Sequence, residues 1–349
     1  MLNAGSGGSI SQTEHQIFLI EMEFPKEIFN VKPADFESLA LSVFRYQSEF
    51  NPVYSRFINL LGTDCDNIES LSQIPFMPAG FFRNHRVVSN STAKPELVFT
   101  SSGTTGSAAS KHYVLSARMY EESFTRGFRY FYGDPSNYVI LAMLPSYLER
   151  EGSSLVYMAD RLIRETGSPA SGFYKNNYSD LLVTINRLRG SERKVILLGV
   201  THALLDLAES HASDLSEVII METGGMKGLR REMVREELHG ILNNAFGTRT
   251  IHSEYGMTEL LSQAYSEEGG LFHTPPWMKV LAGDINDPMS LTDSPGASGT
   301  VNVIDLANFW SCSFIATADL CRLHDNGTFE VTGRYDNSDI RGCNLLSLA

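Results

Sequence analysis

Cysteine is scarce in this sequence of 349 residues, which contains four: Cys65, Cys312, Cys321 and Cys343. These cysteines show neither the paired spacing of a metal-binding motif nor the density of a disulfide-stabilised secreted domain. Few and widely spaced cysteines favour free thiols in a reducing, cytoplasmic environment.

Long apolar runs and an excess of basic residues are also missing. No stretch of about 18 uncharged apolar residues occurs, so we expect no membrane span. Lys and Arg number 28 against 41 Asp and Glu, and the resulting net charge of −13 argues against nucleic acid or an anionic membrane surface as the main partner. The first 14 residues lack the basic start and apolar core of a signal peptide, so we expect a flexible tail there.

Short apolar runs separated by segments of helical periodicity occupy the middle of the sequence. They cover 138–145, 194–200 and 217–225, and 248–259 reads as a further strand that ends in a polar loop. Runs that are apolar on both faces, with helices between them, are typical of buried parallel strands in an α/β sheet. Such sheets usually bind ligands where their strands end. An amphipathic helix is expected earlier, over 34–50.

The pattern changes after about residue 270 to shorter segments of β type. The tripeptide "DNG" at 325–327 stands between two of them and is a strong hairpin signal. We therefore expect an α/β core over 15–270, a small antiparallel β lobe over 271–335, and a short tail over 336–349.

One segment, "FTSSGTTGSAASKHY" at 99–113, is rich in glycine and hydroxyl groups. The apolar residues 97–99 predict a short strand that enters it, and no side chain from Thr100 to Gly106 is larger than threonine. Backbone N–H groups and hydroxyls in such a loop suit phosphate oxygens. A flexible surface turn is the alternative interpretation.

Four further motifs follow this loop in order: "METGGMKG" (221–228), "SEYGMTE" (253–259), "ATADL" (316–320) and "GRYDNSDIRG" (333–342). Together with the loop they resemble the adenylate-forming superfamily of acyl-CoA synthetases, luciferase-like enzymes and adenylation domains, over residues 97–342. The double serine, the "TGGMKG" segment and a cysteine near the C-terminus are most similar to the acyl-protein synthetase family, the fatty-acid-activating subunits of bacterial bioluminescence reductase systems.

This resemblance implies the α/β core of an adenylate-forming enzyme, with mixed or parallel sheets and a small antiparallel β lobe. It implies that ATP and Mg²⁺ convert a fatty acid or another carboxylic acid to acyl-AMP, and that the acyl group passes to a protein thiol. An acyl reductase or an acyl carrier protein is the implied partner. Coenzyme A as the acceptor, or a non-catalytic subunit that binds nucleotide or acyl groups, are the alternatives.

The resemblance also implies roles for single residues. Glu259 would ligate Mg²⁺, Thr258 would contact the α-phosphate, Asp319 would accept hydrogen bonds from the ribose hydroxyls, and Arg334 would reach the ribose or a phosphate. The loop residues that would wrap the β- and γ-phosphates are Ser101, Ser102, Gly103, Thr104, Thr105 and Gly106. The adenine would lie against Gly224, Gly225, Met226 and Tyr255, with Gly256 in the same nucleotide site. A solvated acid is the alternative for Glu259, and core packing is the alternative for Tyr255 and Met226.

Two departures from the superfamily pattern bear on catalysis. The usual loop carries a lysine three residues after its last glycine, but position 109 is Ala, so Lys111 and Lys227 are the candidates for this charge. The chain also ends 13 residues after Asp336, whereas the superfamily continues for about 100 residues, a small-domain length, so the resemblance predicts that the C-terminal lobe is absent.

The cysteine just past the last motif, Cys343, matches the acyl acceptor of the resembled family. A thiolate is a strong nucleophile toward an acyl adenylate. An inert cysteine in a tail is the alternative. For His112, His202 and His252, a structural role is at least as good an interpretation as a place in the acyl site.

Overall fold

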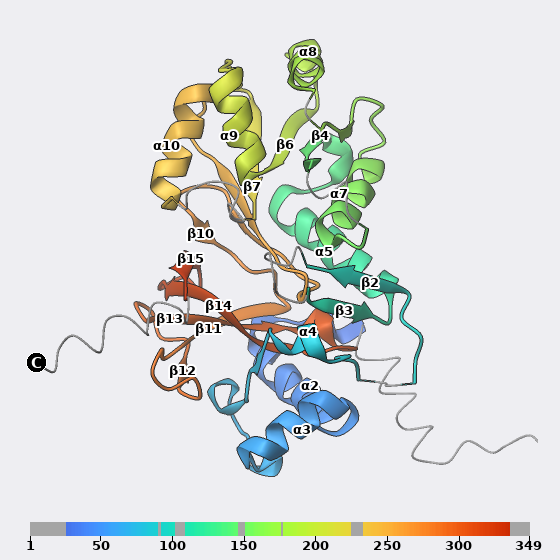
Figure 1. Cartoon of the computed structure of the whole chain (residues 1–349), viewed down its shortest axis with the longest axis vertical. Helices are drawn as coiled ribbons and strands as arrows, with labels where there is room; N and C mark the ends of the chain where they lie inside the picture. Colours follow the sequence, from blue (N-terminus) through green and yellow to red (C-terminus); the bar gives the residue numbers. More distant parts are fainter. Residues whose placement is uncertain are drawn as a thin grey trace, which may run out of the picture.

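Two β-sheets, one largely parallel and one largely antiparallel, organise the chain (Figure 1). The structure is a computed structural model that describes residues 26–89, 92–101, 109–145, 151–175, 177–224 and 233–335. The predicted α/β class with an antiparallel lobe is confirmed. The predicted domain boundaries stay predictions.

The parallel sheet has the strand order β5-β4-β6-β7-β8-β9, and only β9 runs antiparallel to its neighbour. Every residue of β4 is buried, as expected for a strand covered on both faces. Helices α9 (Thr201–Ser210) and α10 (Arg235–Phe246) pack on one face, and α5 (Ala117–Tyr132) and α7 (Ser154–Glu165) on the other (Figure 1). The strands are β4 (Tyr138–Met143), β5 (Gly172–Phe173), β6 (Lys194–Val200), β7 (Val218–Thr223), β8 (His252–Tyr255) and β9 (Ala264–Ser266). The strands predicted within 138–145, 194–200, 217–225 and 248–259 are confirmed.

The antiparallel sheet has the order β10-β15-β14-β13-β11-β12, and β1 adds to β14 in parallel. The predicted hairpin is confirmed, because β14 and β15 pair on either side of residues 325–327. The strands are β1 (Met77–Pro78), β10 (Leu271–Phe272), β11 (Met278–Gly283), β12 (Leu291–Thr292), β13 (Ser298–Asp305), β14 (Phe314–Leu323) and β15 (Phe329–Arg334).

Helices α2 (Phe36–Phe50) and α3 (Pro52–Leu61), near the N-terminal end of the described chain, pack on this second sheet. Gln47 donates to the carbonyls of Asn308 and Phe309 at 3.0 and 2.9 Å, and Asn51 donates to the carbonyl of Ser311 at 2.7 Å. Asn51 also caps α3, since its side-chain oxygen accepts from the first backbone N–H groups of that helix. These hydrogen bonds therefore attach α2 and the start of α3 to the segment between β13 and β14.

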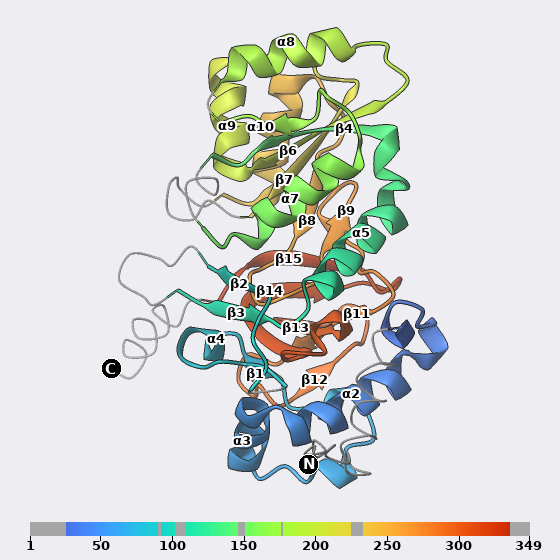
Figure 2. The same ribbon diagram turned by 90° about the vertical axis from the view of Figure 1, so that its right-hand side faces the viewer.

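A β-hairpin and one helix link the two sheets. A hairpin of β2 (Leu97–Thr100) and β3 (Lys111–Val114) lies between them, and α5 runs along the side of both (Figure 2). The helices are α2 (Phe36–Phe50), α3 (Pro52–Leu61), α4 (Phe81–Asn84), α5 (Ala117–Tyr132), α7 (Ser154–Glu165), α8 (Tyr178–Leu188), α9 (Thr201–Ser210) and α10 (Arg235–Phe246). Short 3₁₀ turns cover Pro33–Asp35, Cys65–Asn67, Leu71–Gln73, Pro135–Asn137 and Leu306–Asn308. No helix in the described part of the chain has both the length and the apolar character to cross a membrane.

Candidate active site

A cleft of about 2420 Å³ lies where the parallel strands end and the antiparallel sheet begins. Its walls come from the ends of β6, β7 and β8, from the β2–β3 hairpin, from residues 78–83, and from β14 and β15. The predicted site residues that line this cleft are Ser101, Gly224, Tyr255, Gly256, Thr258, Glu259, Asp319 and Arg334. Segments separated by more than 200 residues in the sequence thus meet in one place.

The remaining predicted residues are either outside the described part of the chain or, in the case of Lys111, away from the cleft. Ser102, Gly103, Thr104, Thr105, Gly106, Gly225, Met226, Lys227 and Cys343 fall outside the described residues. Lys111 is exposed at the start of β3 and is absent from the described residues that line the cleft. Its catalytic role therefore stays a prediction that the geometry does not favour.

The antiparallel sheet contributes Asp319 and Arg334, which stand opposite each other in the β14–β15 ladder. The hydroxyl of Tyr255 donates to Asp319 Oδ2 at 2.9 Å, so this carboxylate joins the two sheets across the cleft. Burial raises the pKa of Asp319, and the Tyr255 hydrogen bond and the Arg334 charge only partly offset it. An acceptor of this kind at a cleft wall suits hydroxyl donors.

The turn after β8 carries Thr258 and Glu259, and three buried side chains hold its backbone. Asn308 donates to the carbonyl of Glu259 at 2.8 Å, and His112 Nδ1 lies 2.9 Å from the carbonyl of Thr258. Asp305 accepts from the backbone N–H groups of residues 261 and 262, at 2.8 and 2.9 Å. The turn is therefore fixed from both the hairpin and the antiparallel sheet.

Glu259 itself is buried, and burial raises the pKa of its carboxyl group. A hydrogen bond with Ser110 and the charges of Arg83 and Arg334 act in the opposite direction. A Cβ atom at Gly256, just before the turn, would lie 2.5 Å from Glu254 Oε1, so a side chain there would have to displace the end of the Glu254 side chain.

The base of the glycine-rich loop is closed by a short ladder. Ser101 N–H donates to the Ser110 carbonyl at 3.0 Å, and Ser110 N–H donates to Ser101 Oγ at 2.9 Å. Thr100 N–H donates to the carbonyl of Gly152 at 2.8 Å, and Gly152 has a φ of +78°. Glycine at 152 therefore helps to set the direction in which the chain enters the loop.

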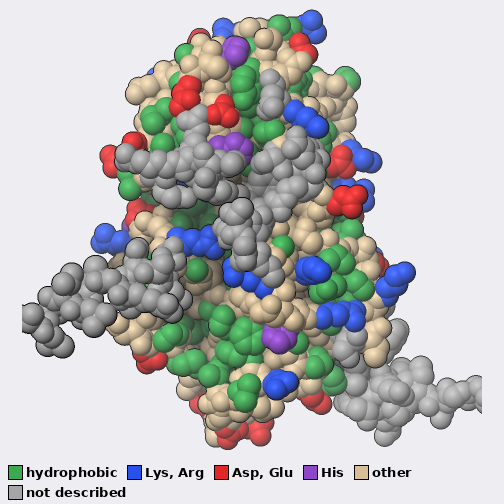
Figure 3. Space-filling model, viewed as in Figure 1, with side chains coloured by type: hydrophobic (Ala, Val, Ile, Leu, Met, Phe, Trp, Pro, Cys, Tyr) green, Lys and Arg blue, Asp and Glu red, His purple; other side chains and the backbone are tan. Residues whose placement is uncertain are grey.

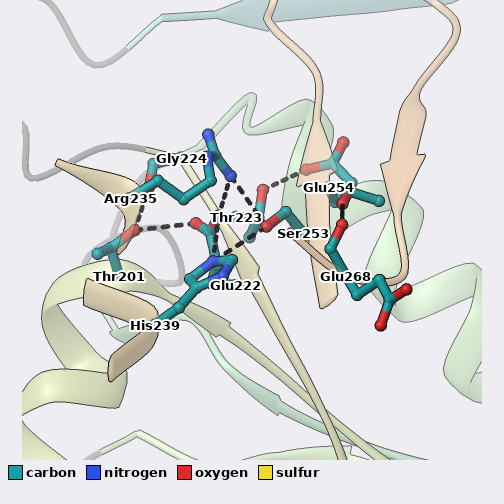
Figure 4. Close-up of polar contacts among 10 residues, drawn as sticks. Thr201, Glu222, Thr223, Gly224, Arg235, His239, Ser253, Glu254 and Glu268 are labelled. Carbon is teal, nitrogen blue, oxygen red and sulfur yellow. Dashed lines mark hydrogen bonds and ion pairs between the residues drawn. The ribbon is translucent and has the colours of Figure 1, made fainter. Parts of the chain in front are cut away.

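A buried ionic cluster at the end of β7 was not predicted from the sequence (Figure 4). Arg235 Nη1 donates to Glu222 Oε1 at 2.6 Å and to Ser253 Oγ at 2.9 Å, and His239 Nε2 lies 3.9 Å from the same carboxylate. Burial alone would raise the pKa of Glu222, but the His239 hydrogen bond and the Arg235 charge outweigh it, and the pKa is lowered. Thr201 bonds both Glu222 and the Gly224 carbonyl. The cluster therefore fixes the backbone at Gly224, within the motif at 221–228.

Several carboxylates line this cleft, but among the described residues they are not grouped as metal ligands. Across the described residues, no group of three or more His, Cys, Asp or Glu side chains is arranged to hold a metal ion. A cation bound against the described part of the cleft would therefore combine a carboxylate with ligands from elsewhere, such as the phosphate oxygens of a substrate.

No family model matches the chain, and no curated protein matches it. Solved structures do match. An amide bond synthetase from Marinactinospora thermotolerans matches at 18% identity and a TM-score of 0.47, over 69% of this chain and 49% of its own. A long-chain-fatty-acid–CoA ligase from Archaeoglobus fulgidus matches at 13% identity and a TM-score of 0.48, over 71% of this chain and 51% of its own. An O-succinylbenzoate coenzyme A synthetase from Bacillus subtilis, in complex with AMP, matches at 16% identity and a TM-score of 0.44, over 82% of this chain and 56% of its own. The chain thus spans about half the length of these proteins.

Proposed function

We propose that the chain joins a carboxylic acid to AMP, with ATP as the second substrate and pyrophosphate as the leaving group. The observation that supports this most is that residues of five separate motifs meet in one cleft. These residues are Ser101 at the start of the glycine-rich loop, Gly224, the turn at 256–259, Asp319 and Arg334. These are the segments that the resemblance assigns to the nucleotide. Chance matches to short motifs have no reason to share a cleft.

The chemistry fits the polar groups of this cleft. A carboxylate oxygen attacks the α-phosphorus of ATP, the bond between that phosphorus and the bridging oxygen to the β-phosphate breaks, and pyrophosphate leaves with the electron pair. Asp319 would accept from the ribose hydroxyls, and Ser101 and Thr258 would donate to phosphate oxygens. Because the turn at 258–259 is fixed by buried partners, these groups need little reorganisation during the reaction.

Magnesium fits the donor set at Glu259. Mg²⁺ is usually held by one or two carboxylates together with substrate phosphates, so a single buried carboxylate beside the nucleotide is sufficient. When bound, the ion would neutralise the negative charge of the triphosphate. Its position against the polyphosphate would be set by Glu259, whose backbone is held by Asn308.

For the second step we propose transfer of a fatty acyl group to a protein thiol, either Cys343 or a cysteine of a reductase or carrier partner. The thiolate attacks the acyl carbon and AMP leaves. Cys312 and Cys321 are poor candidates, because burial raises the pKa of each thiol to about 12 and leaves almost no thiolate at neutral pH. Cys65 is half-buried and does not line the cleft.

The test is to incubate the protein with Mg·ATP and labelled fatty acids of several chain lengths, and to measure both acid-dependent ATP–pyrophosphate exchange and label on the protein. Cys343→Ser is compared with the matched variant Cys65→Ser. We expect exchange in all three proteins, and label in all but Cys343→Ser. Acyl-CoA formed on addition of coenzyme A, without label on protein, would assign the second step to coenzyme A. Tight ATP binding without exchange for any acid would contradict adenylation.

A further inference from the structure

A triphosphate needs positive charge close to its β- and γ-phosphates, and the expected loop lysine is missing. Among the described residues that line the cleft, the cations with permanent charge are Arg83, Arg235, Arg249 and Arg334. Arg235 is already paired with buried Glu222, at 2.6 Å. Arg249 precedes β8, at the opposite end of that strand from Glu259. Among the described cations, Arg83 and Arg334 therefore remain for the phosphates, whereas Lys227 falls outside the described residues.

Arg83 is placed by contacts that begin in the antiparallel sheet. Strand β1 pairs with β14 so that Pro78 stands beside Ala316, and Ala79 N–H donates to the Ala316 carbonyl at 2.9 Å. Helix α4 starts shortly after this pairing, and the strand that pairs with β1 carries Asp319 three residues beyond Ala316. The backbone around Arg83 is thus attached to the wall of the cleft rather than to a separate surface loop.

The residue before Arg83 connects α4 to the turn that carries Glu259. Phe82 is fully buried, and its ring meets the ring of His112 edge to face at 5.3 Å. His112 in turn lies 2.9 Å from the Thr258 carbonyl. The chain of contacts Phe82–His112–Thr258 therefore fixes the backbone of α4 relative to residues 258 and 259.

The side chain of Arg83 is exposed, and within the described ranges it has no ion pair or hydrogen bond. It lines the cleft together with Ser101, Ser110, Glu259 and Arg334, and its charge acts on Glu259 together with that of Arg334. Lys and Arg side chains gather across the middle of the face shown in Figure 3. Two arginines, two serines and one carboxylate around the same space form a donor set for a metal-bound polyphosphate.

We propose that Arg83 binds the β- and γ-phosphates of the nucleotide, and the pyrophosphate that leaves, in place of the missing loop lysine. This inference rests on the proposed adenylation for its biological meaning. A guanidinium group suits the task, because its forked N–H donors bind two phosphate oxygens at once and its charge persists at every physiological pH. Arg83 was missed in the sequence because it lies before the glycine-rich loop and outside all five motifs.

The experiment measures the binding of Mg·tripolyphosphate and of Mg·ATP by titration calorimetry, without any acid. Arg83→Gln removes the charge, Arg83→Lys keeps the charge without the forked donors, and Lys111→Gln and Lys227→Gln test the two rival cations. Arg86→Gln is the matched control, since Arg86 is an exposed arginine three residues along whose guanidinium lies over the Tyr113 ring instead of lining the cleft. Thermal unfolding of each variant checks that it is folded, and we expect no change for the exposed positions 83, 86 and 111.

For Arg83→Gln we expect both ligands to bind roughly tenfold to a hundredfold more weakly, as for a lost hydrogen bond to a charged group. Arg83→Lys should be intermediate, and Arg86→Gln should equal the wild type. Unchanged binding by a folded Arg83→Gln, or a loss in Lys111→Gln or Lys227→Gln alone, would overturn the proposal. So would a wild-type protein that binds neither ligand, or an Arg83→Gln enzyme whose KM rises for the acid and not for ATP. Binding that depends on Arg83, without acid-dependent exchange, would support this site and contradict the proposed adenylation.

Discussion

His112 makes the fold sensitive to mild acid. Its ring is fully buried, and because a carbonyl oxygen only accepts hydrogen bonds, Nδ1 must carry the proton that it shares with the Thr258 carbonyl. Nε2 is therefore the unprotonated nitrogen, and it has no hydrogen-bond partner in the described part of the chain. Protonation of Nε2 would place a charge in an apolar site beside Phe82. Burial accordingly lowers the pKa of His112 to about 4, against the smaller opposite effect of the Thr258 hydrogen bond.

The sign and size of the effect follow from the two pKa values. Histidine in the unfolded chain has a pKa of about 6.5, above the folded value of about 4, so the contribution to stability is complete above pH 6.5 and is lost as the pH falls toward 4. At pH 5 the unfolded chain is almost fully protonated at His112, whereas about one tenth of the folded molecules are. The free energy of unfolding should therefore be about 2 kcal/mol lower at pH 5 than at pH 7 because of this residue alone.

Urea unfolding at pH 7 and pH 5 measures this difference. In His112→Asn an amide N–H takes the place of Nδ1–H and nothing titrates, so we expect the variant to lose about 2 kcal/mol less than the wild type between the two pH values. His273→Gln, at an exposed histidine, should behave like the wild type. Equal losses in the wild type and in His112→Asn would refute the assignment of a buried neutral imidazole.

Three further predictions concern the loop base, the buried cluster and the thiols. Gly152→Ala should cost roughly 1–3 kcal/mol of stability and raise the KM for ATP, because φ is +78° and the new Cβ would lie 3.0 Å from Thr100 Oγ1. The control is Gly167→Ala, which also has a positive φ but has open space around the new Cβ. In the same urea assay it separates the cost of backbone strain from the cost of the clash. Arg235→Met should cost roughly 3–5 kcal/mol, because it leaves buried Glu222 without its ion-pair partner. Arg129→Met breaks only the solvent-accessible pairs with Asp134 and Glu165, and should cost about 1 kcal/mol or less. At pH 8, iodoacetamide should label Cys312 and Cys321 in the native protein far more slowly than Cys65, and should label all three alike after unfolding, as measured by peptide mapping.

Local patterns in the sequence predicted the elements well. The helix expected over 34–50 is present as α2, and the strand expected within 248–259 is present as β8. The three apolar runs expected as buried strands are present in the same sheet as β8. Their burial on both faces leaves a continuous apolar signal that needs no knowledge of the partners. Apart from Lys111, the predicted site residues that are described also meet in one cleft, because the ends of parallel strands lie at the same edge of a sheet.

Contacts between distant segments could not be predicted in the same way. Strand β1 has two residues and no periodic signal, yet its pairing with β14 places Arg83 at the cleft. Similarly, nothing near Arg235 indicates that its partner is Glu222, because the pair depends on how α10 packs beside the end of β7.

The turn that carries Glu259 explains why the functional motif could be found but its support could not. The string "YGMTE" is visible in the sequence, whereas the groups that fix it, His112, Asp305 and Asn308, come from segments about 50 to 150 residues away. Each of these partners is buried and polar, and such a group is costly to bury without a hydrogen bond. A pattern of apolar residues contains no information about which backbone carbonyl or N–H will satisfy it. A variant of any of the three should therefore move the turn and weaken Mg·ATP binding, although Asp305 and Asn308 lie outside every motif and His112 lies only at the end of the glycine-rich segment.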